Sequence, residues 1–171
     1  RNMAGFGVPV IVSINKFTSD TDAEIKVLSD AAHASGAIAV TITEVHAKGG
    51  EGGEDLAKAV VKAVQDHVAA GRPFTPLFLN DAPVMDKITA IATRMYKAKD
   101  VYLETTAKKQ LEKILSWGYG KLPVCMAKTQ YSFSHDASKL GAPSDFTLPI
   151  REFRLNSGAG FIVAMRTMLT K

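Results

Sequence analysis

The chain has 171 residues, of which 46% are hydrophobic and 22% are charged, and its formal net charge is +4 at pH 7. This composition is typical of a folded globular protein and excludes a disordered, low-complexity chain. No apolar run is long enough to cross a membrane, and no amino-terminal stretch has the pattern of a secretion signal. We therefore expect a cytoplasmic protein that does not act in a membrane.

The first predicted strand covers residues 8–14, an almost wholly apolar run that is rich in β-branched side chains. Such a run predicts a strand covered on both faces in a mainly parallel sheet. Asn15, Lys16 and Phe17 follow at its carboxyl end, which is the edge where open α/β sheets bind ligands. These three residues are either part of a binding site or an ordinary turn from strand to helix.

A helix is predicted next, because residues 19–22 supply capping side chains and apolar residues then recur at helical spacing up to Gly36. Asp20 and Thr21 are expected to be caps rather than catalytic groups. Residues 37–43 form a second apolar run of strand length, which predicts a right-handed β-α-β crossover. The ends of the two strands should then lie on the same rim of the sheet.

A glycine-rich segment at residues 48–53 lies on that rim and leads into a helix predicted for residues 54–70. Its glycines permit positive φ angles and a close approach of the backbone to a ligand. Backbone N–H groups at the start of a helix can bind an anion. The segment lacks the Gly-Lys-Ser/Thr ending of a P-loop and the spacing of a dinucleotide fingerprint, so a plain flexible connection remains the alternative.

Residues 72–76 break the pattern, and they divide the chain into two predicted domains, residues 1–72 and residues 73–171. The second domain should contain amphipathic helices at residues 84–97 and 105–117 and strands at residues 122–127, 149–155 and 161–163. Cys125, the only cysteine, is expected to be a buried structural thiol in a reduced, intracellular protein.

Four segments occur in a characteristic order: residues 6–12, residues 15–24, residues 44–53 and residues 122–134. Together they resemble formate–tetrahydrofolate ligase, and the resemblance extends over residues 6–163. Members of that family are longer, and the match is to their carboxyl-terminal part. The resemblance implies an α/β fold, with part of a parallel-sheet region like that of P-loop NTPases followed by a smaller α/β domain that is incomplete at its end.

Members of that family join formate to tetrahydrofolate, with ATP hydrolysed to ADP and phosphate and formyl phosphate as the intermediate. The substrates would be ATP with Mg²⁺, formate and tetrahydrofolate, without a tightly bound cofactor, and a homo-oligomer is expected. Phosphoryl transfer needs a P-loop, a divalent cation and a positive clamp. No stretch of the 171 residues has the P-loop pattern. The catalytic residues are therefore expected upstream, and the isolated chain is expected to be an inactive fragment.

The resemblance assigns Phe17 to one face of the pterin ring of folate and His46 to the opposite face, where the family often has Trp. A surface-loop histidine is the alternative for His46. Imidazole offers less stacking area than indole, so weaker pterin binding is expected. No metal site is predicted. The other expected contacts to substrate or nucleotide are Asn15, Lys48, Gly49, Gly50, Gly52, Gly53, Lys128 and Gln130.

The charge is unevenly distributed, with seven basic and nine acidic residues in residues 1–72 but fourteen basic and eight acidic residues in residues 73–171. ATP and the glutamate tail of folate explain this positive half, and the sequence has no dense basic run or aromatic platform for nucleic acid. Besides the ligase fragment, two hypotheses stay open: a noncatalytic folate- or nucleotide-binding module derived from the family, and an interaction domain retained for assembly.

Overall fold

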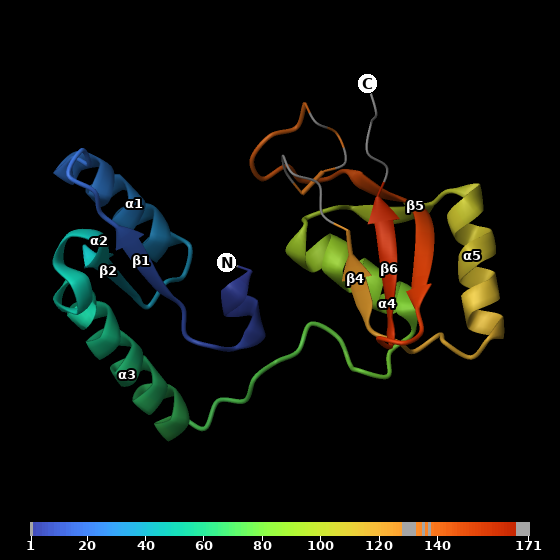
Figure 1. Cartoon of the computed structure of the whole chain (residues 1–171), viewed down its shortest axis with the longest axis horizontal. Helices are drawn as coiled ribbons and strands as arrows, with labels where there is room; N and C mark the ends of the chain where they lie inside the picture. Colours follow the sequence, from blue (N-terminus) through green and yellow to red (C-terminus); the bar gives the residue numbers. More distant parts are fainter. Residues whose placement is uncertain (1, 128–132, 135, 137, 167–171) are drawn as a thin grey trace. The chain divides into compact units, whose positions relative to one another are not determined.

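The computed structural model describes residues 2–127, 133–134, 136 and 138–166. The chain divides into two compact units, residues 1–75 and residues 76–171 (Figure 1). Both units combine helices with parallel strand pairs, which confirms the predicted α/β class. Within the described residues, no helix is both long enough and apolar enough to cross a membrane.

The first unit is built on two parallel strands, β1 (Ile11–Asn15) and β2 (Ala39–Thr43), joined by helix α1 (Asp22–Ala34). Asn15 lies opposite Thr43 in the ladder, so the two strand ends share one edge as predicted. Beyond β2 the chain forms a single-turn helix α2 (Val45–Lys48), a 3₁₀ helix η2 (Gly49–Gly53) and helix α3 (Glu54–Ala69) (Figure 1). A short 3₁₀ helix η1 (Met3–Phe6) precedes β1.

The prediction that the first strand is covered on both faces is wrong. Of the apolar residues in β1, only Ile14 is buried, and Ile11 and Val12 remain partly exposed. Among the described residues β1 pairs with β2 alone, and a sheet of two strands leaves its second edge open. Several apolar side chains of α3 are exposed as well, and Val68 is 72% exposed, although Ala63 of the same helix is buried.

The second unit contains a mixed four-stranded sheet in the order β3-β5-β6-β4. Strands β5 and β6 form an antiparallel pair, whereas β3 pairs with β5 and β4 with β6 in parallel. Strand β3 was missed at the sequence level, because its four residues, with alternating exposure, give too short a pattern. The bounds are β3 (Asp100–Leu103), β4 (Val124–Met126), β5 (Thr147–Asn156) and β6 (Phe161–Arg166).

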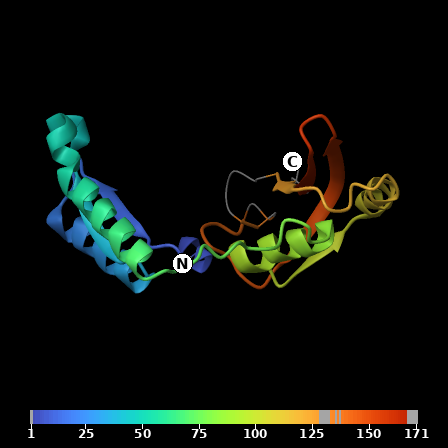
Figure 2. The ribbon, with the colours of Figure 1, turned by 90° about the horizontal axis from the view of Figure 1, so that it is seen from below.

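Helices α4 (Val84–Ala90) and α5 (Thr105–Ser116) pack on this sheet and confirm the predicted amphipathic segments. Figure 2 shows α4 (yellow-green) from the side and α5 (yellow) nearly end-on, so the two helices run in different directions. The helix predicted for residues 84–97 continues past α4 as a π-helical turn, η3 (Ile91–Met95). The core combines buried residues of both helices with the strands, including Val84, Ile88, Ala107, Leu111, Leu148, Ile150 and Ile162.

Cys125 is exposed, which corrects the prediction of a buried thiol. Strand β4 pairs only with β6 among the described residues, so it is an edge strand of the sheet. Side chains alternate between the two faces of a strand, and here Val124 and Met126 pack against the core while Cys125 lies between them. The sequence pattern around Cys125 is apolar on both sides and therefore concealed this alternation.

Lys87 is the largest fully buried side chain of the chain's described part, with 1% of its surface exposed. Its Nζ atom donates hydrogen bonds to the carbonyl oxygens of Asn80 at 2.6 Å, Lys121 at 2.7 Å and Leu122 at 3.2 Å. Burial lowers the pKa of Lys87, whereas the three carbonyl oxygens favour its charged form. The ammonium group thus joins the segment before α4 to the segment before β4.

Replacing Lys87 by Met should lower the free energy of unfolding of the second unit by about 2–4 kcal/mol, because three carbonyl oxygens lose their buried donor. Urea denaturation followed by the fluorescence of Trp117, the chain's only tryptophan, measures this change. The control is Lys109→Met on the exposed face of α5. Equal midpoints for the two variants would contradict a structural role for Lys87.

Candidate functional site

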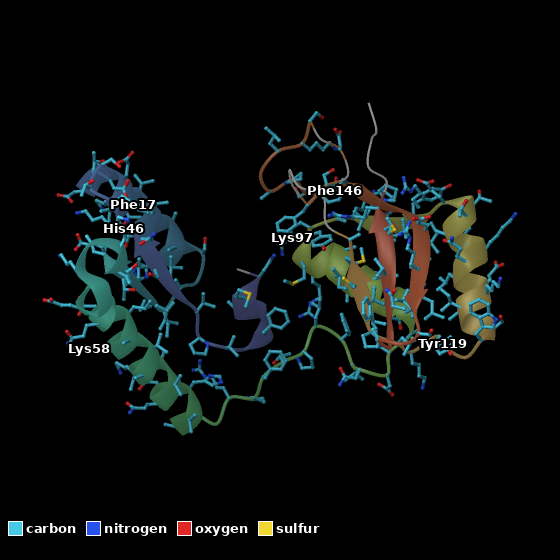
Figure 3. The ribbon with its side chains drawn as sticks, viewed as in Figure 1. Phe17, His46, Lys58, Lys97, Tyr119 and Phe146 are labelled. Carbon is cyan, nitrogen blue, oxygen red and sulfur yellow. The ribbon has the colours of Figure 1, made fainter. Side chains whose placement is uncertain are left out.

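The edge at which β1 and β2 end brings together two aromatic rings that the sequence places in separate motifs. Phe17 follows β1 and His46 lies in α2, after β2. Figure 3 shows both side chains at the same end of the first unit. Their ring centroids are 5.7 Å apart, the ring planes are tilted by 51°, and Phe17 is 48% exposed. The parallel register of the strands therefore creates an accessible aromatic pair.

A tight turn holds Phe17. Its backbone N–H donates to Oδ2 of Asp20 at 2.7 Å, and the N–H of Asp20 donates back to the carbonyl oxygen of Phe17 at 3.1 Å. Thr21 then caps α1 through a capping box with Glu24, which confirms the expected cap. Asp20 is not the cap that the sequence predicted, because its carboxylate accepts from the N–H of Phe17 and the N-cap residue is Thr21.

Hydrogen bonds to Glu44 close the helical turn α2, which carries His46. The N–H groups of Ala47 and Lys48 donate to the carbonyl oxygen of Glu44, and Nζ of Lys48 lies 2.6 Å from Oε2 of Glu44. The N–H of Glu44 donates to the carbonyl oxygen of Gly52 at 3.0 Å. Glu44 thus connects the end of β2, the helical turn that carries His46 and the glycine-rich segment.

The glycine-rich segment is a 3₁₀ helix rather than an extended loop, and within Gly49–Gly53 only Gly49 has a positive φ, at 61°. At Gly52 a Cβ atom would lie 2.6 Å from both the carbonyl carbon and the carbonyl oxygen of Glu44. The close approach that glycine permits is therefore made, at Gly52, to the segment's own chain. The sequence predicts either a close approach to a ligand or a plain flexible connection, and this contact within the chain is neither.

Charged side chains in the segments that carry the aromatic pair form ion pairs. Nζ of Lys16 lies 3.5 Å from Oδ1 of Asp22, and Lys48 pairs with Glu44. The hydrogen bond from Lys48 lowers the pKa of Glu44, and the same bond raises the pKa of Lys48. Both side chains are partly exposed, and the Lys48 ammonium group has further donors beside the one that it gives to Glu44.

A cleft of about 760 Å³ lies along β1 and α1. Its volume falls in the range of small-molecule sites. Asn15 and Asp20 line it together with the apolar side chains of Val12, Ile14 and Leu28. The cleft places Asn15, a candidate from the sequence, beside apolar side chains of β1 and α1.

The spacing of the aromatic pair limits what can bind between the rings. A flat heterocycle between two parallel rings needs about 7 Å between the ring planes, because each van der Waals contact takes about 3.5 Å. The observed rings are 5.7 Å apart and tilted by 51°. At least one of the two side chains must rotate before a flat ligand ring can enter.

The remaining candidates fall elsewhere. Lys128 and Gln130 lie outside the described residues, so the structure does not place them. In the described part of the chain, no group of three or more His, Cys, Asp or Glu side chains is arranged to hold a metal ion. Asn15, Phe17, His46, Lys48 and the glycine-rich segment are all at the carboxyl edge of the two strands or directly after it.

Comparison with protein-family models gives one match that covers the whole chain. The model described as formate–tetrahydrofolate ligase matches residues 1–171. This range is longer than the region over which the sequence motifs were recognised, and it includes both compact units.

Replacing Lys48 by Met should raise the pKa of Glu44 toward its ordinary value, because the hydrogen bond that stabilises the carboxylate is lost. In the native chain the Glu44–Lys48 pair contributes stability above the unfolded-state pKa of Glu44, and this contribution disappears as the pH falls through the lowered folded-state pKa. NMR titration of the Glu44 carboxyl carbon measures the shift. Lys58→Met, which breaks the analogous Glu54–Lys58 pair, should leave the pKa of Glu44 unchanged.

Proposed function

Because the chain belongs to the formate–tetrahydrofolate ligase family, we propose that it supplies the folate-binding part of an ATP-dependent ligase. The reaction joins formate to tetrahydrofolate and gives 10-formyltetrahydrofolate, ADP and phosphate through formyl phosphate. The observation that carries the proposal is the proximity of Phe17 and His46, which come from different motifs and whose ring centroids are 5.7 Å apart.

The pterin ring of tetrahydrofolate is flat and polarisable, and it suits a site made of two aromatic faces. Each offset aromatic contact contributes about 0.5–1.5 kcal/mol beyond the burial of area. In the proposed complex the ring enters between Phe17 and His46 after His46 rotates. The backbone of Phe17 is held by the hydrogen bond from its N–H group to Asp20 at 2.7 Å. Asn15 and Lys48 are proposed as polar contacts at the same edge.

Formate is a poor electrophile, so the reaction needs its conversion to formyl phosphate before the folate nitrogen can attack it. That step requires a P-loop to hold the ATP phosphates and a divalent cation to neutralise the transferring group. These 171 residues contain no P-loop pattern. We propose that a P-loop-bearing segment other than these residues supplies this step.

A second candidate function is a noncatalytic folate- or nucleotide-binding module derived from the same family. The lack of a P-loop pattern in this chain favours it. The two functions separate in one experiment on the polypeptide that joins this chain to the proposed P-loop-bearing segment, mixed with tetrahydrofolate, formate and ATP with Mg²⁺. Formation of 10-formyltetrahydrofolate supports the ligase, whereas tetrahydrofolate binding without formylation supports the binding module.

Replacing Phe17 by Ala should weaken tetrahydrofolate binding by about 5–30-fold, because one aromatic face and its buried area are lost. Isothermal titration calorimetry measures the dissociation constant. The matched control is Phe74→Ala, which removes a ring that stacks on Phe6 in the same unit at 5.7 Å. A dissociation constant for Phe17→Ala equal to that of the native protein would remove the main support for the proposed folate site.

Replacing His46 by Trp should tighten tetrahydrofolate binding, because indole presents a larger stacking face than imidazole. Isothermal titration calorimetry tests this expectation. His33→Trp, at the exposed end of α1, controls for a nonspecific effect of adding indole. An unchanged or weaker affinity for His46→Trp would exclude His46 as a stacking partner.

A further inference from the structure

We propose that Gly52 is a positioning residue for His46, and that the glycine-rich segment Gly49–Gly53 is the scaffold of the aromatic pair rather than a cradle for an anion. This inference rests on the proposed folate site for its functional consequence. Its structural basis lies in the contacts between Gly52 and Glu44, which involve backbone atoms.

The contact at Gly52 leaves no room for a side chain. A Cβ atom there would lie 2.6 Å from the carbonyl carbon and oxygen of Glu44 and 2.9 Å from the backbone nitrogen of Val45. All three neighbours are main-chain atoms, which cannot move aside as the end of a flexible side chain can. Either the backbone at Glu44 or the 3₁₀ helix η2 would have to shift.

A shift at Glu44 reaches His46 through hydrogen bonds. The carbonyl oxygen of Glu44 accepts from the N–H groups of Ala47 and Lys48, which close the helical turn that contains His46. The N–H of Glu44 donates to Gly52, so the same residue is held from both sides. The His46 ring therefore depends on the packing of Gly52 for its place beside Phe17.

The amides at the ends of the segment are already engaged within the turn. The N–H of Gly49 donates to the carbonyl oxygen of Val45, and the N–H of Glu54 donates to the carbonyl oxygen of Glu51. An anion cradle needs several backbone N–H groups directed at the ligand. The hydrogen bonds at the two ends favour a scaffold that closes on α2.

The test compares Gly52→Ala with Gly5→Ala in the same protein. Gly5 also lies in a 3₁₀ helix of the first unit, and a Cβ atom there meets nothing within 4 Å. NMR measures the nuclear Overhauser effect between the ring protons of Phe17 and His46. Gly52→Ala should weaken this effect and lower tetrahydrofolate affinity about 5–10-fold, whereas Gly5→Ala should change neither.

A double-mutant cycle separates positioning from a general loss of structure. If Gly52 acts through His46, the effect of Gly52→Ala on tetrahydrofolate affinity should disappear in a His46→Ala background. An equal loss of affinity in both backgrounds would overturn the proposal. An unchanged ring-to-ring effect in Gly52→Ala would also overturn it.

Two further outcomes remain informative. If Gly52→Ala does not fold, Gly53→Ala replaces it, because a Cβ atom at Gly53 presses on the same turn through a milder contact, 3.2 Å from Cγ2 of Val45. If the native protein does not bind tetrahydrofolate, the proposed function fails. The nuclear Overhauser measurement then still decides whether Gly52 positions His46.

Discussion

The parallel pairing of β1 with β2 is the constraint on which the candidate site depends. With Asn15 opposite Thr43, the segments that follow the two strands begin at the same edge, and Phe17 and His46 meet there although 28 intervening residues separate them. The segment that carries each ring is stabilised by its own hydrogen bonds. A turn closed by Asp20 holds Phe17, and the contact between Glu44 and Gly52 supports His46.

The two units bury their apolar side chains to different extents. The second unit buries a core of two helices against four strands. The buried Lys87 joins two of its loops through hydrogen bonds to their carbonyl oxygens. The first unit buries only Ile14, Ile25 and Ala63 among its apolar side chains, and the valines at positions 60, 61, 64 and 68 of α3 stay exposed. A site on the first unit therefore has a well-defined local geometry beside a sheet edge that a further strand can extend.

The segments that follow β1 and β2 carry ion pairs as well as the aromatic pair. Lys16 and Lys48, which belong to the segments that follow the two strands, each form an ion pair with a carboxylate. Exposed ion pairs of this kind add little to stability. In the proposed folate complex, the ligand enters after the rotation of an aromatic side chain rather than the rearrangement of a loop.

Local signals in the sequence determined the α/β class, the β-α-β unit, the cap at Thr21 and the two amphipathic helices, because apolar periodicity and capping act over a few residues. The motifs also identified Phe17 and His46, whose function stays a prediction. Only the tertiary structure decided the open edge of β1, the exposure of Cys125, strand β3 and the contact of Gly52 with Glu44. These features depend on which backbone atoms meet after folding, and no local pattern of side chains encodes that.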